Sequence, residues 1–122
     1  INLLIGMAVM LLAATFAFAH HGPDKVTWDD VADKQPAVTF DHAKHANELV
    51  DSCDTCHHTN KGLTAEDDKK VMPCTKCHLK KPMGDVGTMK DMSPKKNPMH
   101  IKCMGCHKEN DGPTKCTECH QK

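Results

Sequence analysis

The chain has 122 residues, with 16 lysines, no arginine and 16 acidic residues, so its formal net charge at pH 7 is zero. Only 3% of its residues are aromatic, but it contains eight cysteines and ten histidines. This length suits one domain, and the shortage of large apolar residues excludes a large side-chain core. A domain of this kind needs disulfides, metals or cofactors for its stability.

Residues 1–19 form an apolar segment without charged residues that ends in Ala17-Phe18-Ala19. An apolar segment closed by small residues is typical of a secretory signal peptide. It is short for a membrane helix, which needs about 20 apolar residues. We predict a signal peptide over residues 1–19, truncated at its start, and a mature domain over residues 20–122. A retained N-terminal anchor is the alternative.

Four stretches of the mature chain have interpretable local patterns. Residues 22–41 alternate weakly between apolar and polar side chains, which permits a short two-stranded element. Residues 41–52 are predicted to form a short helix, and residues 64–67 have the threonine and acids typical of a helix start. Residues 80–98 contain three prolines and two glycines, which predicts a loop.

All eight cysteines fall in pairs separated by two residues, and a histidine follows each pair. The first to fourth motifs are Cys53-x-x-Cys56-His57, Cys74-x-x-Cys77-His78, Cys103-x-x-Cys106-His107 and Cys116-x-x-Cys119-His120. Cys-x-x-Cys-His is the attachment motif for c-type haem, with two thioether bonds from the sulfurs and the histidine as the proximal iron ligand. We therefore predict four covalent c-type haems.

Paired cysteines also serve two other chemistries. Eight cysteines in a short secreted chain suggest four disulfides, and two Cys-x-x-Cys pairs can hold one tetrahedral zinc ion. Neither alternative gives a reason for a histidine after every pair. Maturation of c-type haem outside the cytoplasmic membrane also agrees with a signal peptide, so haem is favoured.

Four histidines outside the motifs match the four irons that need a sixth ligand: His42, His45, His58 and His100. His58 directly follows the first motif's histidine, so it must serve a different haem. His42 and His45 lie three apart on one face of a helical turn, where they would bring two irons close together. A solvated helix face is the alternative for that pair. Methionine ligands would raise the potential, but the histidines suffice, and we expect the methionines to pack against the porphyrins.

The pattern Phe40-x-His42-x-x-His45, the His57-His58 pair and the position of His100 resemble the tetrahaem cytochrome c3 family, the class III cytochromes c, over residues 37–122. The resemblance implies a small, mainly α fold with extensive loops, nucleated by four haems, and a short N-terminal two-stranded β element. It also implies the sixth ligands: His42 for the first motif's haem, His58 for the second, His45 for the third and His100 for the fourth. The uniform cysteine spacing and residues 112–116 are similar to the trihaem cytochrome c7 proteins, which lack the second haem.

Charge is distributed unevenly along the mature chain. Residues 20–68 contain four lysines and eleven acids, whereas residues 69–122 contain twelve lysines and five acids. Six lysines lie close in sequence to the last two motifs: Lys95, Lys96, Lys102, Lys108, Lys115 and Lys122. They form either an ordinary solvated face or a docking surface for acidic redox proteins. In the resembling family such a surface docks hydrogenase.

The resemblance implies a periplasmic, low-potential electron carrier that shuttles electrons between hydrogenase or other dehydrogenases and membrane redox complexes in anaerobic respiration. We expect no enzyme activity, because two imidazoles fill both axial positions of each iron. A multihaem reductase of metal ions or oxyanions is one alternative, which needs an open iron. A filament subunit that stacks its haems as a wire is another, with His20 or His21 ligating a neighbour. We expect a monomer and no nucleic-acid partner.

Overall fold

The computed structural model describes residues 22–29, 34–67, 71–79 and 81–122. The predicted signal peptide, together with His20 and His21, lies outside the described residues. Within the described part of the chain, no helix has the length and apolar character needed to cross a membrane.

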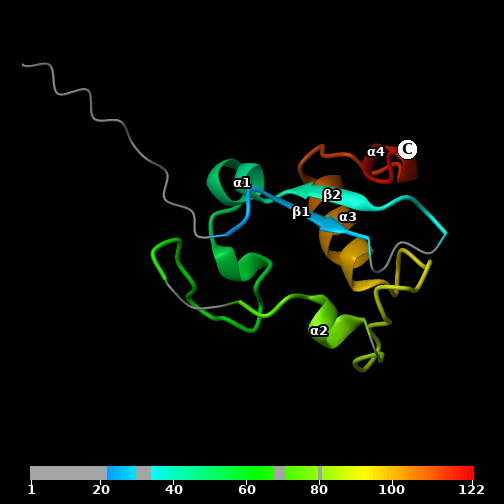
Figure 1. Ribbon diagram of the computed structural model, residues 1–122, viewed down its shortest axis with the longest axis horizontal. Helices are drawn as coiled ribbons and strands as arrows, with labels where there is room; N and C mark the ends of the chain where they lie inside the picture. The colour runs from blue at the N-terminus through cyan, green and yellow to red at the C-terminus, as the bar shows by residue number, and fades with distance from the viewer. Residues whose placement is uncertain (1–21, 30–33, 68–70, 80) are drawn as a thin grey trace, which may run out of the picture.

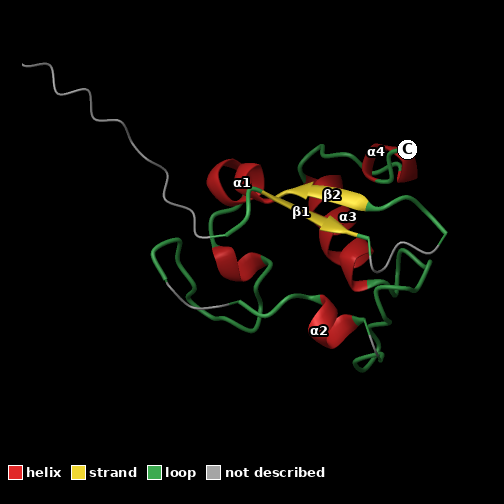
Figure 2. Ribbon diagram, viewed as in Figure 1, coloured by secondary structure: helices red, strands yellow, loops and turns green. Residues whose placement is uncertain are grey.

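A two-stranded antiparallel sheet pairs β1 (Lys25–Trp28) with β2 (Val38–Asp41). Val26 lies opposite Phe40 and Trp28 opposite Val38, so the four apolar side chains share one face of the sheet. The rings of Trp28 and Phe40 are diagonal neighbours on this face and stack with their centroids 5.5 Å apart. The two-stranded element expected from the weak alternation is thus confirmed (Figures 1 and 2).

The helical segments are short except for one. The chain passes directly from β2 into α1 (His42–Lys44) and a π-helical turn η1 (His45–Leu49), and α1 contacts β1 (Figure 1). A short helix was predicted here, and the helical backbone runs from His42 to Leu49. The remaining segments are η2 (Cys53–Thr55), α2 (Thr75–His78), α3 (Pro98–Glu109) and α4 (Cys116–Cys119).

Long loops connect these elements, as Figure 2 shows, so the described chain has few helices and the expected extensive loops. The loop predicted over residues 80–98 is observed over residues 81–97, and α3 begins at Pro98. The helix start predicted at residues 64–67 is wrong, because these residues form a turn instead. The Asp67 carboxylate accepts hydrogen bonds from Thr64 N and Oγ1, at 2.8 and 3.2 Å, and thereby closes the turn on itself.

Few side chains are buried among the described residues. Leu63 and Met89 are the buried apolar side chains, at 8% and 4% exposure, and no side chain falls below 2%. Several large apolar side chains are exposed instead: Leu49, Met72, Met83, Met92 and Ile101. Protein side chains alone therefore form a very small core, as the composition indicated.

Candidate haem sites

The eight histidines predicted as haem ligands lie in four pairs. The ring centroids are separated by 6.2 Å in His42–His57, 5.9 Å in His58–His78, 6.1 Å in His45–His107 and 6.3 Å in His100–His120. Every pair joins the histidine of one motif to a histidine outside that motif. The structure thus brings together the same rings that the resemblance assigns to each haem.

These separations fit an iron held between two imidazoles. Two metal–nitrogen bonds of about 2 Å each, with about 1 Å from each nitrogen to its ring centre, separate the centroids by roughly 6 Å. Contacting aromatic rings also prefer centroid distances of about 4.5–7 Å, so one such pair carries little weight. Four pairs, each including the histidine of a Cys-x-x-Cys-His motif, fit haem sites much better than chance ring contacts.

The first and third pairs both depend on the junction between β2 and α1. The Asp41 carboxylate accepts a hydrogen bond from Lys44 N at 2.9 Å and so caps α1. Phe40 packs against the two histidines that follow it, with its centroid 6.3 Å from that of His42 and 4.4 Å from that of His45. The capped turn and the aromatic contact direct these two imidazoles toward different motifs.

Hydrogen bonds to backbone carbonyls select the tautomer of three ligand rings. Because a carbonyl oxygen only accepts, Nδ1 of each of these rings must donate, which leaves Nε2 with the lone pair that binds a metal. The three bonds are 2.7 Å long and join His45 to Asp41, His107 to Pro113 and His120 to Pro36. Pro36 is 84 positions from His120, and nothing in the sequence marks its carbonyl as a ligand partner.

Burial also disfavours the charged form of two of the rings. It lowers the pKa of His57 and that of His100 below the usual histidine value, and the nearby His42 and His120 imidazoles lower them further. Metal binding requires the neutral imidazole. The protein environment therefore favours the ligating form of both rings near neutral pH.

A close glycine contact shapes the third site, and the sequence analysis assigned no role to this glycine. Asp111 has a φ of 54°, which turns the chain back after α3, and Gly112 N donates to His107 O at 2.8 Å. A Cβ on Gly112 would lie 2.7 Å from Cγ and Cδ2 of His107. Only glycine allows the Gly112-Pro113 segment to pass this close, where the Pro113 carbonyl reaches the His107 ring.

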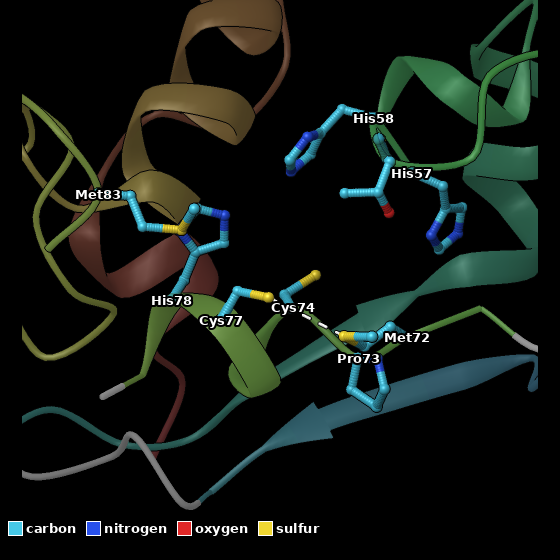
Figure 3. A pocket seen from close by; sticks show the side chains of 10 residues that line it. His57, His58, Met72, Pro73, Cys74, Cys77, His78 and Met83 are labelled. Atoms are coloured by element: carbon cyan, nitrogen blue, oxygen red, sulfur yellow. Dashed lines mark hydrogen bonds between the residues drawn. The ribbon is translucent and has the colours of Figure 1, made fainter. Parts of the chain in front are cut away.

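A pocket at the second motif contains every residue type that a c-type haem site needs (Figure 3). Cys74, Cys77 and His78 line it together with His58, and Figure 3 shows both sulfur atoms beside the space between the two rings. The exposed Met72 and Met83 also line it, with Met72 Sδ 3.9 Å from Cys77 Sγ. The second motif, whose haem the trihaem proteins lack, therefore has its two cysteines, its histidine and His58 around one pocket.

The cysteines fit thioether attachment better than the two alternatives. All eight are free, which gives the disulfide alternative no support. Burial raises the pKa of the Cys103 thiol to about 11 and also raises the pKa of Cys56 and Cys74. A zinc site needs thiolates, and within the described ranges no three His, Cys, Asp or Glu side chains converge on a metal position.

Comparison with known proteins agrees with this site chemistry. The model of the class III cytochrome c family matches residues 17–121. A cytochrome c3 from Desulfovibrio desulfuricans is 38% identical over 90 residues, which cover 70% of this chain and 78% of that protein. Another cytochrome c3, from Desulfuromonas acetoxidans, is 34% identical over 99 residues, which cover 81% of this chain and 98% of that protein. A cytochrome c7 from Geobacter metallireducens is 46% identical over 50 residues, which cover 40% of this chain and 49% of that protein. The resemblance predicted from the motifs is confirmed.

Gly112→Ala is expected to displace the His107 ring, because the new methyl group overlaps it. Overpacking of this kind costs about 1–3 kcal/mol, which thermal unfolding of the haem-loaded protein would measure. Gly105→Ala is the matched control, since a Cβ there meets no atom within 4 Å and the residue lies inside α3. Alanine is favoured over glycine in a helix by about 0.5–1 kcal/mol, so the control should be slightly stabilised. Equal effects of the two variants would contradict the contact.

Proposed function

Because the chain belongs to the class III cytochrome c family and is a multihaem electron-transfer cytochrome, we propose that it carries electrons at low potential through four bis-histidine haems. The observation that carries this proposal is the set of four imidazole pairs, each of which includes the histidine of a Cys-x-x-Cys-His motif. When bound, each haem supplies an iron that alternates between ferric and ferrous states. The two imidazoles of each pair would bind this iron and favour a low potential in an exposed site, while the two cysteines would anchor the cofactor covalently.

The arrangement of the histidines along the chain supports transfer between haems within one molecule. His57 and His58 are consecutive but belong to the first and second pairs, and His42 and His45 share one helical segment but belong to the first and third. A single turn of backbone therefore ties each of these two neighbouring site pairs together. Short, fixed separations of this kind suit electron exchange inside the protein.

We further propose a periplasmic location and a docking surface for acidic redox proteins. The apolar segment over residues 1–19 supports export. The six lysines near the third and fourth motifs are all exposed, and a cluster of exposed positive charge attracts acidic surfaces and raises the association rate. Hydrogenase or another dehydrogenase is the proposed electron donor, and a membrane redox complex the proposed acceptor, in anaerobic respiration.

The number of haems is tested by the intact mass of the mature protein. We expect the polypeptide plus four haems, and a loss of one haem when Cys74 and Cys77 are both replaced by alanine, because these sulfurs form its covalent bonds. Thr75→Ala, inside the same motif, is the control and should keep all four. A wild-type mass with three haems would contradict the proposal for the second site.

Bis-histidine ligation is tested by carbon monoxide binding to the reduced protein. The wild-type protein should show no spectral change, because no axial position is open, whereas a reductase with an open iron should bind the gas. His58→Ala should open one of the four irons and give binding at that haem alone. Thr59 lines the same pocket and has no predicted ligand role, so the control variant Thr59→Ala should behave like the wild type. Carbon monoxide binding by the wild type would favour the reductase alternative.

The docking surface is tested by charge reversal at Lys102 and Lys108, both exposed on α3. The double glutamate variant should react with an acidic redox protein roughly tenfold more slowly at low salt, and the difference should shrink as ionic strength rises. Stopped-flow mixing measures this rate. The same charge change at exposed Lys34 and Lys61, in the acidic half of the chain, is the control. Equal rates for the two variants would mean that net charge alone, and not this surface, governs association.

A further inference from the structure

Asn97 is a buried polar side chain with no role in the site described so far. Its exposure is 6%, and no other polar or charged side chain among the described residues is buried to this degree. It occupies the N-cap of α3, three positions before His100. Buried polar side chains are costly unless they are hydrogen-bonded, so its partners indicate what the position does.

The Asn97 amide uses its complete hydrogen-bonding capacity. A carboxamide has two N–H donors and two acceptor lone pairs. Nδ2 donates to Met89 O and to Asp91 O, both at 2.8 Å. Oδ1 accepts from Met99 N at 2.9 Å and from His100 N at 3.3 Å. One side chain therefore joins the loop before α3 to the first turn of the helix.

The loop that Asn97 holds is itself attached to the second motif. Met89 N donates to His78 O at 2.8 Å, and the Met89 side chain is 4% exposed. Gly87 N donates to Lys96 O at 2.8 Å, which closes the same loop next to Asn97. A continuous chain of hydrogen bonds therefore runs from the proximal histidine of the second site through Met89 and Asn97 to the backbone of His100.

The carbonyl oxygen of the Asn97 amide, Oδ1, determines where α3 begins. Asn97 Oδ1 satisfies two N–H groups that have no partner inside the helix, and Pro98 occupies the first turn, where its fixed φ is tolerated. His100 lies in this turn, with its ring centroid 6.3 Å from that of His120. A helix that began one residue later, or that frayed at this end, would carry His100 away from its partner ring.

We propose that Asn97 is a positioning residue for the fourth haem site, which holds the His100 imidazole opposite His120 by anchoring the start of α3 to the Met89–Asp91 loop. This inference rests on the proposed function, in that His100 is taken as the sixth ligand of the fourth haem. Asn97 itself contacts neither imidazole ring through any described hydrogen bond and acts only through the backbone.

The test uses Asn97→Ala in the mature, haem-loaded protein. Losing the amide removes both the helix cap and the loop anchor, so His100 should leave its iron in a large fraction of molecules. We expect carbon monoxide binding and a high-spin signature at one of the four haems, while the intact mass still includes four. Proton NMR of the oxidised protein should show which haem changes, because His100→Ala should alter the same resonances.

Two further variants separate positioning from a general loss of structure. Asn97→Asp keeps a side-chain acceptor for the cap but loses the two donors to the loop, so it should give the same signature in a smaller fraction of molecules. It also keeps the proposal testable if the alanine variant fails to mature. Asn110→Ala removes an exposed asparagine at the other end of α3, which donates to Cys106 O at 2.9 Å, and should leave the fourth haem low-spin.

The results distinguish this proposal from the proposed function. If the wild type already binds carbon monoxide, or carries fewer than four haems, bis-histidine electron transfer through four haems is wrong. If the wild type has four low-spin haems and both Asn97 variants keep them, with unchanged potentials, the positioning role alone is refuted. If the double variant of Asn97→Ala and His100→Ala has a larger effect than His100→Ala at the fourth haem, the two residues act independently, which also contradicts the proposal.

Discussion

One recurring arrangement organises the described structure: each motif histidine faces a second imidazole with ring centroids 5.9 to 6.3 Å apart, a separation that would suit an iron bound by both rings. A motif supplies two sulfurs and one ring from neighbouring residues, but the opposite ring must come from elsewhere. The strand pair, the turn at His42 and the start of α3 all place such a ring. The regular elements are therefore best understood as supports for the ligands.

Because the side-chain core is small, the predicted haem sites also matter for the stability of the fold. Leu63 and Met89 are the only buried apolar side chains among the described residues. Five large hydrophobic side chains are exposed instead: Leu49, Met72, Met83, Met92 and Ile101. So little buried area stabilises a domain weakly. Ligand sites that unite distant segments couple cofactor binding to folding, because the unfolded chain has no preformed site. Loss of a predicted ligand histidine is therefore expected to affect both stability and electron transfer.

Backbone groups are the hydrogen-bond partners of several of the predicted ligand rings. Three ligand rings donate to main-chain carbonyls, and the Asn97 amide acts wholly on main-chain atoms. Such partners orient a ligand and raise its basicity as side chains do. Apart from Asp41, which ends β2, these carbonyls lie in loops, which explains how a loop-dominated chain can orient its histidine rings.

The sequence by itself determined the parts of this protein that depend on short spacings. Two cysteines and a histidine within five positions specify a haem attachment site, four further histidines match the motifs in number as predicted second ligands, and a weak apolar alternation predicted the strand pair. Its local signals failed at residues 64–67, where Asp67 closes a turn onto Thr64 and no helix follows in the described residues.

Only the tertiary structure decided which groups hydrogen-bond to the predicted ligand histidines or pack against them. Pro36 reaches His120 across 84 positions, and Gly112 passes the His107 ring too closely for any side chain. The sequence analysis assigned no role to Asn97, and its burial and its hydrogen bond to Met89 O become visible only in three dimensions. The physical reason is that every residue has a backbone carbonyl, so a partner of this kind leaves no mark in the amino-acid pattern and is selected by how the chain folds.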